Sequence, residues 1–217
     1  MSAEMATTLD VQASWDTFGT KAGYTQFYAG TPMWKTTYDL DRYRKVIEAT
    51  RPSVLVETGT CWGGFAAWVA GEFGVDVVTV DVSAPKRRLR EWPRVTFVSG
   101  DSADPVTVER VAGLVDGRRC MVSLDSDHHA PHVVAEIEAY SPLVSPGCYL
   151  VVEDGLADLL DADRAIRFGR DIPATGGPLR AIGQTVATWP GWRRDIELEG
   201  LTPVSHHPAG WWVRDDG

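Results

Sequence analysis

The sequence predicts an α/β domain built on a doubly wound, mostly parallel β-sheet. Apolar runs rich in Val and Leu alternate with segments of helical periodicity, and they predict strands at 54–57, 77–81, 95–98, 121–124 and 149–152. Such runs are typical of strands buried on both faces, and strand–helix repeats at this spacing indicate parallel pairing. The chain has 217 residues, which favours one domain, or one domain with an extension.

The segments between these strands carry apolar residues at helical spacing. Leu40, Tyr43 and Ile47 share one helical face, and we expect this helix to be capped by Asp39 and to end before Pro52. Further helices are expected from Phe65, Trp68, Val69 and Phe73; from Val108, Val111 and Val115 after an Asp104-Pro105 start; from Val133, Ile137, Tyr140 and Val144; from Ile166 and Phe168; and from Ile182 and Val186.

Both ends of the chain depart from this alternation. Residues 1–38 mix aromatic and polar side chains, and they predict an N-terminal extension or a lid ahead of the main domain at 39–217. Residues 192–198 and 210–214 predict two antiparallel strands. The basic, proline-bounded segment 84–93 is expected to be a solvated loop or helix.

Composition excludes several classes of protein. The formal net charge is −9, which argues against nucleic acid or an anionic membrane as a partner. Cys61, Cys120 and Cys148 lack metal-ligand spacing, and free thiols with no N-terminal signal pattern predict a cytoplasmic protein. No apolar run approaches the ~20 residues that a membrane helix needs.

The glycine turn after the first strand, at 57–64, predicts the cofactor. A dinucleotide fingerprint would place a second glycine where this chain has Cys61, and the acid Glu57 would repel a pyrophosphate. A carboxylate there suits a ligand that brings positive charge. Asp81, which ends the second strand, can hold two ribose hydroxyls. S-adenosylmethionine (SAM) meets both demands, with its amino-acid end near Gly59, and is favoured over NAD.

The third strand ends in Gly100-Asp101-Ser102, which is well placed to border the adenine. The alternative for the glycines is a tight strand–helix turn without a ligand, but acids at the ends of successive strands argue against it. The expected cofactor-binding residues are Glu57, Gly59, Thr60, Gly63, Asp81, Asp101, Ser102 and Asp125.

A second group of acids follows the fourth and fifth strands. Asp125 ends one strand, and Glu153 and Asp154 end the next. Carboxyl ends of neighbouring parallel strands face one crevice, so these carboxylates can meet around one ion. Successive side chains in a strand point to opposite faces, so Glu153 and Asp154 can share an ion only if the strand breaks there, which Gly155 allows. Three carboxylates suit Mg²⁺, Mn²⁺ or Ca²⁺; the alternative is that they are caps or solvated loop ends.

Three histidines, His128, His129 and His132, lie where the fourth strand meets the next helix. Such clusters can bind Zn²⁺ or, with a carboxylate, Fe²⁺, although His129 and His132 equally fit polar loop or first-turn residues. His128, three residues after Asp125, could act as a general base because the unperturbed pKa of imidazole is about 6.5. The pair His206-His207 lies too far downstream to be assigned to this cluster.

Motifs in this order resemble the cephalosporin hydroxylase family. These enzymes are SAM- and metal-dependent methyltransferases, among them enzymes of cephamycin 7-methoxylation and rhamnosyl O-methyltransferases. The similarity runs from about Trp34 to Arg214. It is carried by Glu57-Thr-Gly-Thr-x-Trp-Gly-Gly, Leu124-Asp-Ser-Asp-His128, Tyr140-Ser-Pro-Leu-Val-Ser-x-Gly and Val151-Val-Glu-Asp154.

The resemblance implies a class I SAM-dependent methyltransferase fold, with a mostly parallel seven-stranded sheet and an antiparallel C-terminal strand. It also implies Mg²⁺ bound by Asp125, Glu153 and Asp154. In the related catechol-type methyltransferases a lysine base lies three residues after the first metal aspartate, which corresponds to His128 here. The segment His129-Ala-Pro-His132 departs from the family pattern.

We therefore expect a SAM- and Mg²⁺- or Mn²⁺-dependent O-methyltransferase that acts on a hydroxyl of a small molecule, such as an antibiotic or sugar intermediate. A homo-oligomer is expected, with Trp34 and Tyr38 in the candidate lid. Two alternatives remain: a non-haem iron oxygenase that uses His128, His129 and His132, and a non-catalytic binder of SAM or another metabolite.

Overall fold

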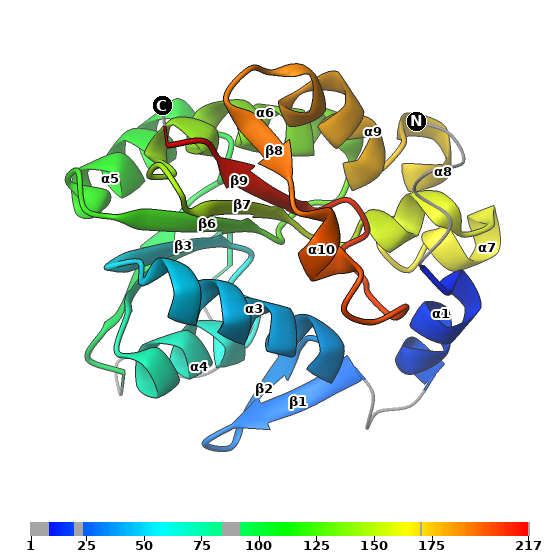
Figure 1. The fold of residues 1–217 in the computed structure, drawn as a ribbon, viewed down its shortest axis with the longest axis horizontal. Helices are drawn as coiled ribbons and strands as arrows, with labels where there is room; N and C mark the ends of the chain where they lie inside the picture. Colours follow the sequence, from blue (N-terminus) through cyan, green and yellow to red (C-terminus); the bar gives the residue numbers. More distant parts are fainter. Residues whose placement is uncertain (1–8, 20–23, 84–91, 170, 217) are drawn as a thin grey trace.

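The main sheet has seven strands in the order β5-β4-β3-β6-β7-β9-β8. All neighbours pair in parallel except β9, which is antiparallel to both β7 and β8. The computed structural model describes residues 9–19, 24–83, 92–169 and 171–216. Within them, helices cover both faces of the sheet, and a separate two-stranded hairpin lies beside it (Figure 1). The predicted fold class is confirmed.

The strands and helices follow the predicted alternation. The strands are β1 (Thr25–Tyr28), β2 (Thr31–Trp34), β3 (Val54–Thr58), β4 (Asp76–Asp81), β5 (Val95–Ser99), β6 (Cys120–Leu124), β7 (Tyr149–Val152), β8 (Trp192–Arg194) and β9 (Trp211–Arg214). The α-helices are α1 (Val11–Gly19), α3 (Thr37–Thr50), α4 (Gly64–Phe73), α5 (Pro105–Val115), α6 (Ala130–Tyr140), α7 (Ala162–Ala165), α8 (Ile172–Thr175), α9 (Pro178–Gln184) and α10 (Ile196–Glu199). Short 3₁₀ turns lie at Ser141–Leu143, Gly155–Leu159 and Val186–Thr188.

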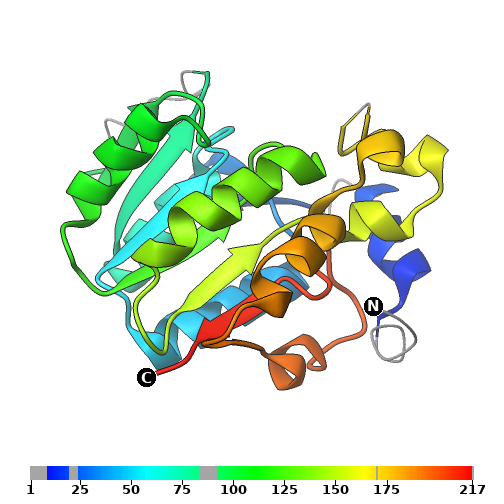
Figure 2. The same ribbon diagram turned by 90° about the horizontal axis from the view of Figure 1, so that it is seen from above.

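Strand β3 shows how the sheet divides the core. Every residue of β3 is buried. Val54 and Val56 belong to the core layer that includes residues of α5, α6 and α9, whereas Leu55 belongs to the layer of α3 and α4. Successive side chains of a strand point to opposite faces, so one apolar run serves both layers. Figures 1 and 2 show these two sets of helices on opposite faces of the sheet.

Helix α3 begins at Thr37, and its cap differs from the prediction. Thr36 is the N-cap, and its Oγ1 accepts the backbone N–H of Asp39 at 3.0 Å. The Asp39 carboxylate is therefore not used as a cap, and it is completely buried. There it accepts hydrogen bonds from Arg42 and Ser205, which makes Asp39 a core residue.

Two further elements are shorter than predicted. Strand β8 ends at Arg194, because Asp195 caps the short helix α10 that occupies part of the predicted strand. The antiparallel pairing of β8 with β9 is confirmed. Helix α7 ends at Ala165, so the expected helical residue Ile166 follows it and is 51% exposed.

The N-terminal hairpin β1–β2 packs on α4. Met33 of β2 is buried in the same core layer as α4. Gly64 begins α4, and a Cβ there would lie 2.2 Å from the carbonyl oxygen of Pro32. The basic segment 84–93 lies almost entirely outside the described residues.

Two expectations from composition can be compared with the structure. Cys61, Cys120 and Cys148 are free thiols. Among the described residues, no helix is long and apolar enough to cross a lipid bilayer.

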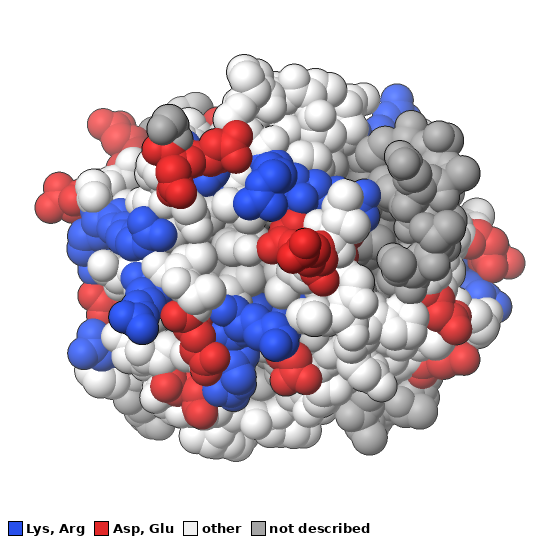
Figure 3. All heavy atoms as spheres, in the orientation of Figure 1, with Lys and Arg blue, Asp and Glu red and all other residues white. Residues whose placement is uncertain are grey.

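On the face shown in Figure 3, acidic and basic side chains are interspersed rather than gathered in one patch of a single sign.

We expect Gly64→Ala to destabilise the fold by about 1–3 kcal/mol, because the added methyl group must displace the hairpin backbone. The matched control is Gly113→Ala in α5, where a Cβ meets nothing within 4 Å. That substitution should stabilise the protein by about 0.5–1 kcal/mol through helix propensity. Urea unfolding measures both free energies, and equal effects would contradict the packing of α4 on the hairpin.

Candidate active site

Two adjoining cavities lie at the carboxyl ends of the parallel strands. The first, of about 220 Å³, is lined by residues of the glycine turn together with Asp125, His128 and Asp154. The second, of about 250 Å³, is lined by residues that include Gly100, Asp101, Ser102 and His132. Residues Gly59, Asp81 and Ser126 border both cavities. The crevice outside the carboxyl ends of strands is where ligands bind in open α/β sheets.

Gly59 holds the ends of β3 and β6 together. Its φ is +87°, and a Cβ at this position would lie 1.9 Å from the carbonyl oxygen of Asp125. The glycine is therefore required by the neighbouring strand end as well as by any ligand. Gly63 has a φ of 77° and is the N-cap of α4, and it is not among the residues that line the two cavities.

Asp81 lies at the boundary between the two cavities with its carboxylate fixed. Oδ2 accepts the backbone N–H of Cys61 at 3.0 Å, and Oδ1 accepts that of Ser83 at 2.8 Å. The carboxylate thus links the glycine turn to the end of β4. Its predicted role in binding a ribose stays a prediction.

Glu57 lies in the wall of the first cavity and is 2% exposed. Its Oε2 accepts a hydrogen bond of 2.5 Å from Thr79 Oγ1, which is also 2.7 Å from Thr60 Oγ1. Burial raises the pKa of Glu57 to about 8. The carboxyl group is therefore mostly protonated at neutral pH, and it becomes charged when a cation lies beside it.

The three neighbouring histidines do not converge on one point. His128 Nε2 lies 3.4 Å from Asp154 Oδ2, whereas His129 Nδ1 pairs with Asp127. His132 faces the second cavity, where its Nε2 lies 3.1 Å from Ser102 Oγ. An iron site built from His128, His129 and His132 together therefore has no geometric support.

Asp125, His128 and Asp154 form the group of possible metal ligands that the described residues bring together. One ligand atom from each lies within 4.8 Å of the others. Glu153 lies deeper and is 1% exposed. It accepts hydrogen bonds from Tyr43 Oη at 2.5 Å and Ser123 Oγ at 2.6 Å. The group at this edge of the sheet therefore contains two of the three predicted carboxylates, with His128 in the place expected for Glu153, which lies behind them.

Asp154 itself forms the break that allows both acids to reach this edge. Strand β7 ends at Val152, and Asp154 has a φ of 56°, in the left-handed region. We expected Gly155 to provide the break, but Gly155 does not have a positive φ. Aspartate visits the left-handed region more readily than most residues with a side chain, so the turn occurs one residue earlier.

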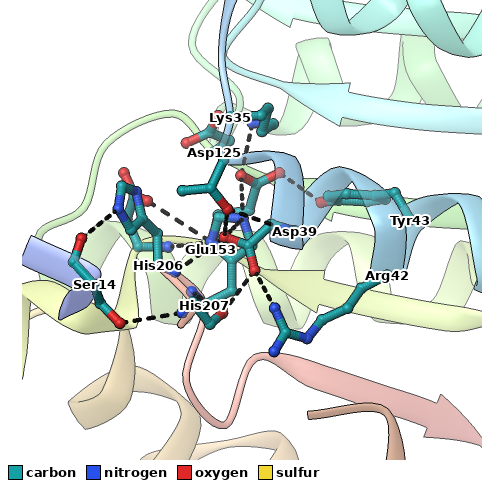
Figure 4. Close-up of polar contacts among 12 residues, drawn as sticks. Ser14, Lys35, Asp39, Arg42, Tyr43, Asp125, Glu153, His206 and His207 are labelled. Carbon is teal, nitrogen blue, oxygen red and sulfur yellow. Dashed lines mark hydrogen bonds and ion pairs between the residues drawn. The ribbon is translucent and has the colours of Figure 1, made fainter. Parts of the chain in front are cut away.

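Lys35, directly after β2, is a site residue that the sequence did not reveal. Its side chain is 3% exposed and forms ion pairs with Asp125 and, at 2.6 Å, with Glu153 (Figure 4). The ammonium also lies 4.9 Å from the centroid of the Phe65 ring. One lysine after an aromatic segment carries little information in a sequence, because the ion pairs join strands far apart in the chain.

Lys35 alone cannot balance three ionised carboxylates in this buried site, so two of the acids hold their protons more strongly than usual. Burial and the nearby Glu153 raise the pKa of Asp125 to about 7, and burial with Asp125 raises that of Asp154 well above its ordinary value. Burial alone would raise the pKa of Glu153, but Lys35 lowers it below its ordinary value. Carboxylates that share a buried site in this way gain from a further cation, so the donor set fits a hard divalent metal ion.

Of the pair His206-His207, His207 also reaches the site, although its distance in sequence argued against it. Both histidines lie in the loop between α10 and β9 and are 1% and 2% exposed. His207 Nε2 is 3.1 Å from Glu153 Oε2. The sequence offered one weak indication, a pair of adjacent histidines, but nothing that placed the pair beside β7.

The strand order, the single antiparallel strand β9 and the crevice at the strand ends define a class I methyltransferase fold. The sequence model of the family described as Rhamnosyl O-methyltransferase/CmcI matches residues 20–215. A rhamnosyl O-methyltransferase of Mycobacterium tuberculosis is 33% identical over 199 residues, which cover 87% of this chain and 78% of that protein. The protein belongs to the rhamnosyl O-methyltransferase/CmcI family, as its motifs indicate.

Solved structures share the fold at lower identity. A structure of CmcI with Mg²⁺ and SAM has a TM-score of 0.60 and 18% identity, covering 87% of this chain and 76% of that one. The methyltransferase MycE of mycinamycin biosynthesis, in complex with Mg²⁺, S-adenosylhomocysteine (SAH) and mycinamycin VI, has a TM-score of 0.51 and 20% identity. The alignment covers 68% of this chain and 41% of MycE.

We expect Lys35→Met to destabilise the protein by about 3–5 kcal/mol, because it leaves buried carboxylates without their cation. Urea unfolding in a metal-free buffer measures this effect. Lys45→Met, at an exposed position of α3, is the matched control and should change stability by less than about 0.5 kcal/mol. If the two variants were equally stable, the Lys35 ion pairs would not support the fold.

Proposed function

We propose that the protein transfers the methyl group of SAM to a hydroxyl group of a small molecule, with a divalent metal ion at the acidic cluster. The observation that carries this proposal is the pair of adjoining cavities, one of which holds Asp125, His128 and Asp154. Membership of a family whose curated relatives are O-methyltransferases supports the same reaction.

We assign SAM one orientation in the crevice. Its amino-acid end would lie at Gly59 and Glu57, its ribose on Asp81, and its adenine in the second cavity beside Asp101 and Ser102. This orientation is supported by Asp81, which borders both cavities, and by Glu57, which can neutralise an ammonium group. Thr60 would assist from the first cavity, while Gly63 would act through the turn rather than by contact.

Asp125, Glu153 and Asp154 are the residues that would hold Mg²⁺ or Mn²⁺. A bound divalent ion lowers the pKa of an acceptor hydroxyl and fixes its oxygen. The protein's own contribution is to gather the charges in a buried crevice, where they are little screened. The CmcI and MycE structures contain Mg²⁺, which supports this choice of ion.

His128 is the residue that would accept the proton of the hydroxyl. Burial lowers its pKa to about 4, so the imidazole is neutral at physiological pH but only weakly basic, and it would take the proton of a hydroxyl that a bound cation has already made acidic. Asp154 Oδ2, 3.4 Å from Nε2, would stabilise the imidazolium that forms. In the reaction the oxygen attacks the methyl carbon, the carbon–sulfur bond breaks, and SAH and the protonated His128 result.

The aromatic side chains of the first cavity would exclude water from this reaction. Tyr24, Trp34 and Trp62 line that cavity beside the acids. Tyr24 and Trp34 stack with their ring centroids 6.2 Å apart. Trp34 is 48% exposed, so it can contact an acceptor that enters from solvent. This arrangement supports the candidate lid at the N-terminal end of the main domain.

The finer assignments are also proposals. The acceptor is a small molecule of antibiotic or sugar metabolism, in keeping with the relatives named above. A homo-oligomer, dimer or larger, and a cytoplasmic location remain predictions from the sequence. Size-exclusion chromatography with light scattering would measure the oligomeric state.

We expect Asp125→Asn to retain SAH binding within several-fold and to lose at least about 100-fold in turnover, because the metal site is impaired. Transfer of a labelled methyl group from SAM to a panel of hydroxylated acceptors, with and without chelator, measures the effect. Glu138→Gln is the control, since Glu138 is exposed on α6 and lines neither cavity. Full activity in Asp125→Asn, or turnover that needs Fe²⁺ and oxygen but not SAM, would contradict the proposal.

Binding of SAH should tighten as the pH rises. The pKa of Glu57 is about 8 in the free protein, above the ordinary 4.5, and an ammonium beside it would lower that value. Binding near pH 7 therefore releases a proton, and the affinity should rise roughly tenfold between pH 6.5 and 8.5. Calorimetry in buffers of different ionisation enthalpy measures the proton release. Glu57→Gln should remove the pH dependence, and its persistence would exclude Glu57 as the source.

A further inference from the structure

His207 lies directly behind the two acids that end β7. Its side chain is 2% exposed. Its Nδ1 accepts the backbone N–H of Asp154 at 3.0 Å, so the proton of the neutral ring is on Nε2. That Nε2 lies 3.1 Å from Glu153 Oε2 and makes no directed hydrogen bond to any residue in the described part of the chain. One imidazole thus contacts the backbone of one acid and the side chain of the other.

These two contacts help to explain how two consecutive acids, Glu153 and Asp154, can face the same site. Consecutive side chains in a strand point to opposite faces, and Glu153 and Asp154 serve one site only because Asp154 has a φ of 56°. A left-handed conformation at a residue other than glycine costs of order 1 kcal/mol and persists only where its surroundings hold it. The hydrogen bond from the Asp154 N–H to His207 is the contact that supports this turn from behind.

The loop that carries His207 is itself tightly held. Ser205 Oγ accepts the backbone N–H of His207 at 2.9 Å and donates to Asp39 Oδ1 at 2.7 Å. Arg42, paired with Asp39, donates to the carbonyl groups of Leu198, Glu199, Thr202 and Val204. The loop that carries His207 is therefore anchored to α3 by hydrogen bonds.

We propose that His207 is a positioning residue that holds the Asp154 turn and the Glu153 carboxylate so that both acids face the same metal ion. The proposal rests on the metal site of the proposed function. Residues that orient metal ligands in this way, without touching the metal, typically contribute about 10–100-fold to metal affinity.

His206 provides a matched control next to His207 in the chain. It is also buried, but its Nε2 lies 2.6 Å from Thr17 Oγ1 and 3.1 Å from the carbonyl oxygen of Ser14. These contacts attach helix α1 rather than the acids of β7. A variant at His206 therefore reports what the loss of a buried histidine in this loop does without removing a contact to the β7 acids.

The test is the affinity of the whole protein for Mn²⁺, measured by electron paramagnetic resonance of the free ion, together with the thermal unfolding temperature. His207→Ala should weaken Mn²⁺ binding about 10–100-fold. His207→Asn should restore binding to within several-fold, since its amide oxygen can take the place of Nδ1. His206→Asn should bind Mn²⁺ like the parent, even if it unfolds at a lower temperature.

The outcomes separate the proposal from its alternatives. Parent-like binding in His207→Ala, or equal weakening in His206→Asn, would overturn the positioning role. If His207→Ala does not fold, two other variants keep the test: the amide of His207→Asn lies near the position of Nδ1, and that of His207→Gln lies near Nε2. His207→Asn must then bind Mn²⁺ more tightly than His207→Gln, and the reverse order overturns the proposal. Failure of the parent protein to bind Mn²⁺ would overturn the proposed function as well, and is thus distinguishable from failure of the His207 proposal alone.

Discussion

The structure depends on the burial of three carboxylates in one crevice. Asp125, Glu153 and Asp154 lie within a low-dielectric edge of the sheet, where each ionised group costs free energy unless a cation or a hydrogen bond compensates it. Distant parts of the chain supply that compensation: Lys35, after the hairpin, supplies a cation, and Tyr43 of α3 donates a hydrogen bond to Glu153. Much of the architecture outside the sheet serves to bring these groups to the acids.

The same constraint explains why the non-sheet segments are anchored by buried polar groups. Asp39 and Arg42 form a buried ion pair on α3, and Arg42 binds four carbonyl groups of the C-terminal segment. Burial would raise the pKa of Asp39, but His207 and Arg42 lower it to about 2. Helix α3 therefore links the C-terminal loop to the site, and the loop in turn reaches Glu153 through His207.

The strand ends were the most predictable part of the site, because a parallel sheet places its carboxyl ends together. Glu57, Asp81, Asp125 and Asp154 were found from this rule, and they line the first cavity, whereas Glu153 lies behind it. The histidines were less predictable. His128, His129 and His132 are neighbours in sequence but face three different partners, whereas His207, discounted for its distance in sequence, lies 3.1 Å from Glu153. Packing sets the direction of a side chain at a strand–helix junction, so the spacing of the histidines in the sequence does not predict which partners they face.

The sequence by itself determined the parallel sheet, the glycine turn and the acids at the strand ends, because these follow from local periodicity, turn chemistry and a general property of α/β sheets. Only the tertiary structure decided which cation lies between Asp125 and Glu153, where β7 breaks, and which histidine supports the break. Those features depend on contacts that Lys35 and His207 make with acids far from them in the sequence. No local pattern specifies a pairing between segments that meet only after the sheet has formed.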